Sequence, residues 1–136
     1  MDISGSFIFS IKDKRLNFKN IEDNLHIEPT KLIKKGQMVG KLKNFEAPFD
    51  IWSFEISITD YKNFFNDLLN LLELLNPYSQ YIKEISLNYE NVTIDCYLRT
   101  KYGQIGFQMD NKIINKLANL GLSLNYHILS YGEAAD

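Results

Sequence analysis

Residues 49–76 read FDIWSFEISITDYKNFFNDLLNLLELLN and join the clearest strand pattern of the chain to its clearest helix pattern. In Phe49–Thr59, apolar residues alternate with polar ones, and strict alternation indicates a strand with one buried face. In Asp60–Asn76, apolar residues recur at intervals of three and four, as in a helix that lies on a core. We expect this strand and this helix to pack together at the centre of the fold. Thr59 or Asp60 is the expected N-cap, and Pro77 is expected to end the helix.

Weaker versions of the same two patterns flank this segment. Alternation predicts five further strands, namely Gly5–Lys12, Glu84–Glu90, Val92–Thr100, Gln104–Met109 and Leu122–Leu129. A turn at Lys101–Gly103 is expected to join two of them as a hairpin. Helical spacing predicts one helix over Arg15–Leu25 with Asn17 as N-cap, and another that begins after Asp110 or Asn111 and ends at Gly121. We therefore predict an α+β fold, with a mostly antiparallel sheet and about three helices packed on one face.

The length of 136 residues predicts a single domain over 1–136 with a short frayed tail at about 131–136. Hydrophobic residues make up 45% of the chain, which is enough to build a substantial core. We expect one buried cluster that contains Trp52, Phe54, Ile56, Leu68, Leu72, Cys96, Leu117 and Leu124.

Charge and cysteine content argue against several classes of partner and compartment. With 15 Lys+Arg against 17 Asp+Glu, the net charge of −2 is too small to indicate a nucleic acid or a membrane. The single cysteine, Cys96, excludes an internal disulfide and suits a reducing compartment. The N-terminal segment has no basic stretch before an apolar run, and no window is long and apolar enough to span a membrane. We therefore expect a cytoplasmic protein.

The residues that carry most catalytic chemistry are sparse. The chain has two histidines, His26 and His127, and alternation places Cys96 on the core face of its strand, where a thiol is inert. Two isolated histidines without a paired-cysteine motif do not form a typical zinc site. No glycine-rich phosphate loop is present, since Gly103–Gly106 is explained by turn geometry. We therefore predict no enzymatic activity, no metal and no cofactor.

Several short motifs resemble one known family. HIEPT at residues 26–30 precedes Lys-Gly, and the chain resembles small bacterial proteins catalogued as domain of unknown function 4279. The segments that carry the resemblance are Leu25–Thr30 with Lys35–Gly36, Ile51–Phe54, Gly103–Phe107 and Leu120–Leu122. The resemblance implies no established enzymatic activity. It implies instead that some members act as immunity proteins or other small interaction modules, because of the gene contexts in which they occur.

The first functional hypothesis is a non-catalytic protein-binding module, in its narrower form an immunity-type protein that neutralises a basic toxin domain. Its candidate partner-binding residues are the polar strand face Asp95, Tyr97 and Arg99, joined by Glu90 and Glu55 if the strands pair suitably. Two alternatives stay open. One is a small-molecule-binding or enzymatic α+β domain with a pocket between sheet and helices, and the other is a homodimeric structural module.

The lysine-rich stretch Lys31–Lys43 is expected to be exposed and mobile, and to bind no nucleic acid. It carries five lysines but lacks the interleaved aromatic side chains on which bases stack. A gel-shift titration against RNA and DNA should detect no binding that depends on these lysines. Phosphate contacts would instead produce micromolar binding that falls by about 0.9 log unit per contact per log of salt. Such binding, lost when the lysines become glutamine, would contradict the expectation.

Overall fold

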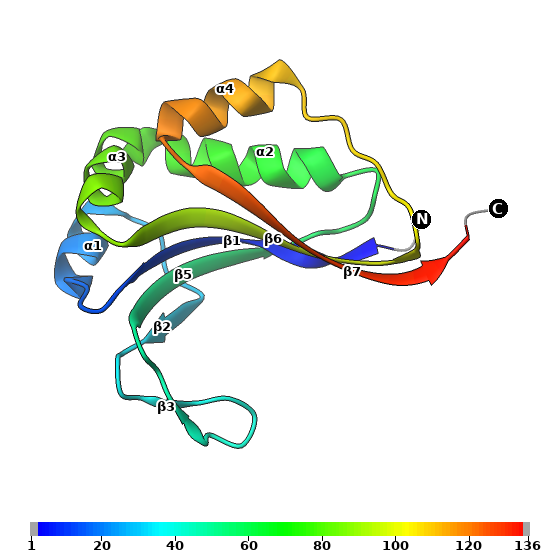
Figure 1. The fold of residues 1–136 in the computed structure, drawn as a ribbon. Helices are drawn as coiled ribbons and strands as arrows, with labels where there is room; N and C mark the ends of the chain where they lie inside the picture. Colours follow the sequence, from blue (N-terminus) through cyan, green and yellow to red (C-terminus); the bar gives the residue numbers. More distant parts are fainter. Residues whose placement is uncertain (1–2, 135–136) are drawn as a thin grey trace.

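A five-stranded sheet covered on one face by helices forms the body of the protein in the computed structural model, which describes residues 3–134 (Figure 1). The order of the strands is β2-β5-β1-β6-β7, and every neighbouring pair is antiparallel except β6 with β7. The bounds are β1 (Ile3–Asp13), β2 (Lys31–Ile33), β5 (Asp50–Ser57), β6 (Asn91–Tyr102) and β7 (Ser123–Glu133). The predicted α+β class and mostly antiparallel sheet are confirmed.

Four α-helices lie among the described residues, one more than the sequence predicted. Their bounds are α1 (Phe18–Asn24), α2 (Phe64–Leu75), α3 (Ser79–Asn88) and α4 (Asn111–Leu120), and a 3-10 turn at Asn76–Tyr78 links α2 to α3. Two predicted caps are confirmed: Asn17 and Asp110 accept backbone N–H bonds at the starts of α1 and α4. The predicted cap of the central helix, Thr59 or Asp60, is wrong, because the N-cap residue of α2 is Asn63. Gly121 ends α4 in the left-handed conformation, with φ of 69°.

The central helix differs from its predicted bounds at both ends. It begins at Phe64 rather than Asp60, because Asp60 accepts a bond from the Asn63 N–H and holds a turn before the helix. Asp67, in the first turn of α2, accepts from both the backbone N–H and the hydroxyl of Thr59. Pro77 does not end the helical path. It lies at the start of the 3-10 turn, where a backbone N–H would have no helical hydrogen-bond partner, so its missing N–H costs little. The chain then continues into α3.

Two predicted strands are wrong. Residues 84–90 belong mostly to α3, whose buried Ile82 and Ile85 lie three positions apart on one helix face. Residues 103–110 form no strand and no hairpin. They cross over α2, where Phe107 stacks on Phe64 with ring centroids 4.3 Å apart, and the Tyr61 hydroxyl donates to the Gly106 carbonyl. Short apolar runs do not distinguish a strand from a segment that packs on a helix.

The crossover determines how the last strand pairs. After β6 the chain passes over the helix layer, forms α4 and returns beside β6, so β7 runs parallel to it. β7 extends to Glu133, beyond its predicted end at Leu129, so residues 131–133 of the predicted tail belong to the strand. Residues 135–136 of that tail lie outside the described residues.

One hydrophobic cluster fills the space between sheet and helices. Phe7 and Phe9 of β1 are fully buried there, and Phe7 contacts Phe64 of α2 with ring centroids 5.1 Å apart. Four of the predicted core residues are buried, namely Trp52, Leu68, Leu72 and Cys96. The other four are partly buried and pack against the cluster, because they lie toward its margins: Phe54, Ile56, Leu117 and Leu124.

The Cys96 thiol is fully buried, as alternation predicted. Burial raises the pKa of this thiol to about 12, so it stays protonated and unreactive near neutral pH. No helix within residues 3–134 is long and apolar enough to cross a membrane.

The lysine-rich segment begins with β2, which pairs with β5, and one carboxylate holds the residues that follow. All five lysines between 31 and 43 are exposed, as predicted, and β3 (Met38–Val39) pairs with β4 (Phe45–Glu46) in a small second sheet. Asp50 accepts the backbone N–H groups of Leu16 at 2.9 Å and Lys35 at 2.6 Å. Desolvation raises the pKa of Asp50, but these two bonds and the charges of Lys34 and Lys35 outweigh it, and the pKa is lowered.

Two leucines of α2 provide a matched test of the packing. Leu72 is fully buried, whereas Leu74 on the same helix is 42% exposed. Leu72→Ala should lower the free energy of unfolding by about 2–5 kcal/mol, because it removes buried surface and leaves a cavity. Leu74→Ala should cost less than about 1 kcal/mol. Urea unfolding of both variants measures the difference, and equal costs would contradict the observed face of the helix.

Candidate functional site

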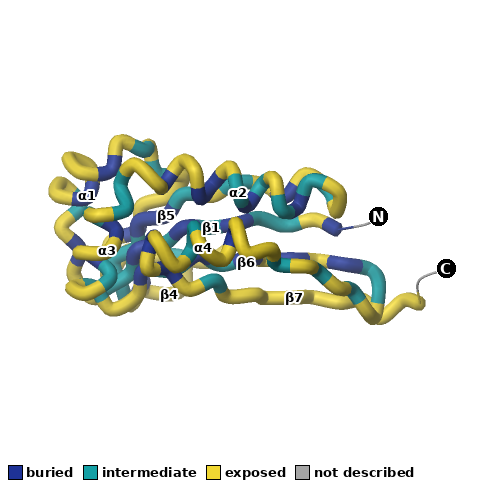
Figure 2. Tube along the Cα trace, turned by 90° about the horizontal axis from the view of Figure 1, so that it is seen from above, coloured by how far each residue is buried: buried dark blue, intermediate teal, exposed yellow. Residues whose placement is uncertain are grey.

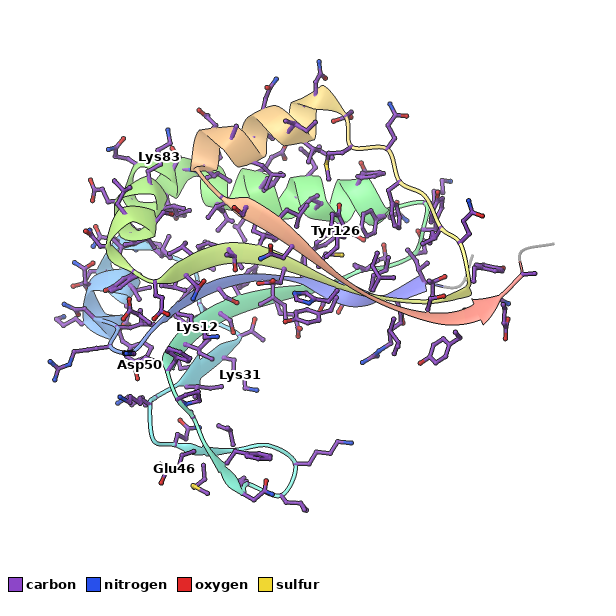
Figure 3. All side chains as sticks on the ribbon, viewed as in Figure 1. Lys12, Lys31, Glu46, Asp50, Lys83 and Tyr126 are labelled. Atoms are coloured by element: carbon purple, nitrogen blue, oxygen red, sulfur yellow. The ribbon has the colours of Figure 1, made fainter. Side chains whose placement is uncertain are left out.

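The face of the sheet opposite the helices is open over much of its area (Figure 1). Alternation brings small polar side chains to this face from the inner strands, including Ser6 and Ser10 of β1 and Ser53 of β5. Lys12 and Lys31 lie on the same side, beneath the sheet as drawn in Figure 3. We call this surface the open face.

Three of the predicted partner-binding residues, Asp95, Tyr97 and Arg99, lie in a row on the open face along β6. The Tyr97 ring stacks on the His127 imidazole of β7, with centroids 4.4 Å apart and planes 10° from parallel. His127 also approaches Asp95, whose Oδ1 lies 2.9 Å from its Nε2. The second oxygen of Asp95 accepts the Thr93 hydroxyl at 2.9 Å. Asp95 thus holds the imidazole in place beneath the tyrosine.

The surroundings of Tyr97 favour its neutral form. Partial burial raises the pKa of the Tyr97 hydroxyl, and the nearby Asp95 carboxylate raises it further. A neutral tyrosine keeps its O–H as a hydrogen-bond donor across the physiological pH range. The stack therefore presents a flat aromatic surface with a polar group at its edge.

Of the two predicted glutamates, the structure brings only Glu55 to the open face. It lies on β5 opposite Ile8, which in turn lies opposite Asp95, and it accepts the Ser6 hydroxyl at 3.0 Å. Glu90 precedes β6 at the far end of the strand, where its backbone N–H donates to Asp13. The segment before Glu90 is helical rather than extended, so Glu90 sits in a turn instead of a strand row.

A hollow of about 600 Å³ lies beside the stack on the open face. Its lining includes Tyr97, His127, Arg99 and Glu55, together with Ser6 and Ser57. Arg99 is exposed, and it forms no ion pair with a carboxylate among residues 3–134. An arginine beside a fixed aromatic stack suits a planar carboxylate or a flat side chain of a partner.

The hollow does not bring a cysteine and a histidine together among the residues that line it. Cys96 lies on the helix side of β6 and His127 on the open face, so the sheet separates the two groups of a cysteine–histidine pair. Within residues 3–134, no three His, Cys, Asp or Glu side chains gather as metal ligands. The Asp95–His127 contact has no hydroxyl or thiol nucleophile hydrogen-bonded to its imidazole among the described residues.

A second and larger cavity, of about 880 Å³, lies between α1 and β2. The HIEPT segment lines it together with Leu25 and Trp52, two residues that belong to the buried core. Its carboxylates, Glu22, Asp23 and Glu28, are exposed at its rim. Ile27 of this motif packs against the core, so the motif that carries the family resemblance has a structural role in this fold.

Sequence reasoning placed His127 on the outward face of its strand but did not connect it to Tyr97 and Asp95. The contact depends on the parallel register of β6 and β7, which pairs Tyr97 with His127 and Asp95 with Asn125. Local sequence contains no signal for that register. The matching phases of the two strands, with Tyr97 and His127 both outward, were the only hint.

The fold and the open face define a class: an α+β domain with helices on one side of a mixed sheet and a polar, aromatic surface on the other. The chain belongs to the family described as Domain of unknown function (DUF4279), whose model matches residues 4–131, and the expected membership is thereby confirmed. Neither a curated protein nor a solved structure matches the chain.

Gly5 fixes the position of Tyr97 and offers a test of the site. Its φ is 141°, and a Cβ added there would overlap the Tyr97 carbonyl oxygen on β6. Gly5→Ala should therefore force β1 away from β6 and lower the free energy of unfolding by roughly 2–4 kcal/mol. Ser4→Ala, at the exposed neighbouring position, should change it by less than about 0.5 kcal/mol. Thermal unfolding of the two variants checks the difference, and a Gly5→Ala variant as stable as the parent would contradict the close approach.

Proposed function

We propose that this protein is a non-catalytic protein-binding module and that the open face is its binding surface. The observation that carries the proposal is the Tyr97–His127 stack, held by Asp95 and lying beside an arginine without a carboxylate partner among residues 3–134. Tyrosine and arginine are enriched among the residues that contribute most to protein interfaces.

The open face is suited to binding because it is already ordered. Its side chains project from paired strands, and the stack fixes the rings of Tyr97 and His127 before a partner arrives. A preorganised surface loses little conformational entropy on binding, which favours affinity. Glu55 and Arg99 supply opposite charges around the hollow, so a partner must present a matching pattern.

The narrower form of the proposal is an immunity-type protein that neutralises a toxin domain. Residues 46–136 contain twelve acidic and six basic residues, and an acidic excess in this part of the chain favours encounter with a basic partner. The gene contexts implied by family resemblance support the same reading. A location in the cytoplasm, where such a partner would be neutralised, is part of this proposal.

Co-expression tests the narrower form directly. Each neighbouring gene product that arrests growth should be expressed with and without this protein, in the same host. Rescue of growth, together with a purified complex of the two chains, is expected for the cognate toxin. The immunity form is overturned if no neighbouring product arrests growth, or if none is bound or neutralised.

Substitutions on the open face test the surface with any partner so identified. Tyr97→Ala and Arg99→Ala should each weaken binding at least about 30-fold, equivalent to about 2 kcal/mol, while the melting temperature stays within a few degrees of the parent. Glu90→Gln is the matched control, because Glu90 is exposed but lies away from the open face. Isothermal titration calorimetry measures all three. Equal affinities for the Tyr97, Arg99 and Glu90 variants would place the binding surface elsewhere.

A second candidate function is the binding of a small anionic molecule in the hollow. Arg99 and His127 both line it, and its volume of about 600 Å³ is within the range of small-ligand sites. A small carboxylate that raises the melting temperature of the parent, but not of Arg99→Ala, would favour this candidate over a protein partner.

A further inference from the structure

β7 is an edge strand with an unpaired outer side. It ends the strand order of the five-stranded sheet, and no described strand pairs with it on the side away from β6. Figure 2 shows it as an exposed segment along one margin of the molecule. From Ser123 to Ser130 it pairs regularly with β6, and the irregularity in the ladder comes only after Thr100 and Ser130. Along these eight regular residues, every second residue therefore directs its backbone N–H and C=O groups to the unpaired outer side.

The β7 edge lacks the devices that usually protect such an edge. Residues 122–132 contain no Lys, Arg, Asp, Glu or Pro, the residues that natural proteins use to block edge-to-edge pairing. Large apolar side chains are exposed on both of its faces: Ile128 is 52% exposed toward the helix side and Leu129 is 53% exposed toward the open face. The regular ladder and the uncharged side chains together favour another strand as the covering element.

The opposite edge of the same sheet makes a contrast. β2 has only three residues, begins with Lys31 and is followed by Lys34 and Lys35. The segment that contains β3 and β4 is linked to its end, through the bond between Gly36 N–H and the Ala47 carbonyl. One edge of the sheet is therefore short and charged, while the other is long and neutral. This asymmetry points to β7 as the pairing edge.

We propose that two copies of this chain pair through β7, antiparallel across a two-fold axis at Tyr126, to form a ten-stranded sheet. In this register Leu124 lies opposite Ile128 of the second copy on the helix side. On the open face Asn125 lies opposite His127 of the second copy. At these two pairs next to the axis, apolar opposes apolar and polar opposes polar, which is the pattern that stabilises antiparallel pairs, whereas the outer pair of Ser123 with Leu129 is mixed.

The absence of Lys, Arg, Asp and Glu from the β7 edge suits a second copy of this chain as the pairing strand. A two-fold axis places identical strands against each other, so any charge near the axis would approach a like charge and destabilise the pair. β7 carries no Lys, Arg, Asp or Glu between Ser123 and Gly132, and Glu133 lies beyond the paired residues. A neutral edge satisfies the requirement for self-pairing without a complementary charged partner.

Sedimentation of the full chain tests the assembly. The parent protein is expected at about twice the chain mass of 15.9 kDa, with dissociation on dilution. Ile128→Lys introduces two charges next to the axis and should give a monomer with an unchanged circular dichroism spectrum. Leu87→Lys is the control, because Leu87 is 89% exposed and lies on α3 rather than on β7. The Leu87→Lys variant should remain dimeric. A parent chain that is monomeric at all accessible concentrations overturns the proposal, as does a dimer unaffected by Ile128→Lys.

A mixed disulfide tests the register. Ser123 of one copy lies opposite Leu129 of the other, where Cα atoms of antiparallel partners are about 4.5–5.5 Å apart, within the range that a disulfide spans. A mixture of the Ser123→Cys and Leu129→Cys variants should form a disulfide-linked dimer when copper–phenanthroline oxidises the two thiols. Neither variant should form this covalent dimer when it is oxidised alone. The native Cys96 is buried and does not compete. Leu87→Cys mixed with Leu129→Cys is the control. Cross-linking by a single variant alone, or by the control pair, contradicts this register.

This inference and the proposed function can fail separately. Ile128 lies on the helix side of β7, whereas Tyr97 and Arg99 lie on the open face of β6. Loss of the dimer without loss of partner binding would leave the binding module intact. If the unpaired edge instead accepts a strand of a different protein, the parent chain would be monomeric alone, and that outcome overturns self-pairing only.

Discussion

The burial of the inner face of β1 beneath α2 is the constraint on which the rest of the structure depends. β1 is the middle strand of five, and Phe7, Phe9 and Ile11 all project toward the helices with no exposed surface. Such a face is covered only when β5 and β6 flank it and a helix closes over it. Phe64 at the start of α2 contacts Phe7, Phe65 and Phe107, so one ring joins the sheet, the helix and the crossing segment. The contact of Phe64 with Phe107 holds the segment that follows β6 against α2.

The path of the chain after β6 produces both features on which function is proposed. Because residues 103–110 pack on α2 instead of forming a hairpin strand, the chain reaches its last strand from the helix side and pairs in parallel. The parallel register brings His127 beneath Tyr97 and within reach of Asp95. It also places β7 at the margin of the sheet, beyond the cover of the helices. An antiparallel hairpin at Lys101–Gly103 would have given neither arrangement.

The parts of the fold that the sequence predicted are those determined by local patterns. The alternation of β1, β5 and β6, the spacing of α2 and α4, and the caps Asn17, Asp110 and Gly121 each depend on neighbouring residues only. The open-face row Asp95, Tyr97 and Arg99 followed from the same alternation. The errors arose where tertiary packing determines the structure. Phe107 lies in a segment without regular secondary structure and packs on a helix. Ser79–Asn88 is a helix, although its short apolar run also fits a strand. Partners across strands, such as His127 for Tyr97, depend on register and stay invisible to local patterns.

The polar and apolar residues on the two faces of β7 show which of its side chains core packing explains and which it does not. Leu124, Tyr126 and Ile128 project to the helix side, and their exposure increases along the strand as it leaves the helix layer. A strand that served only to close the core would need apolar residues at its first positions and polar ones beyond them. β7 remains apolar to Ile128 on one face and carries Leu129 and Tyr131 on the other. Core packing accounts for Leu124, and the stack with Tyr97 accounts for His127. The exposed apolar positions that remain agree with the proposed second strand beside β7, whose side chains would contact them and whose backbone would satisfy the free groups of β7.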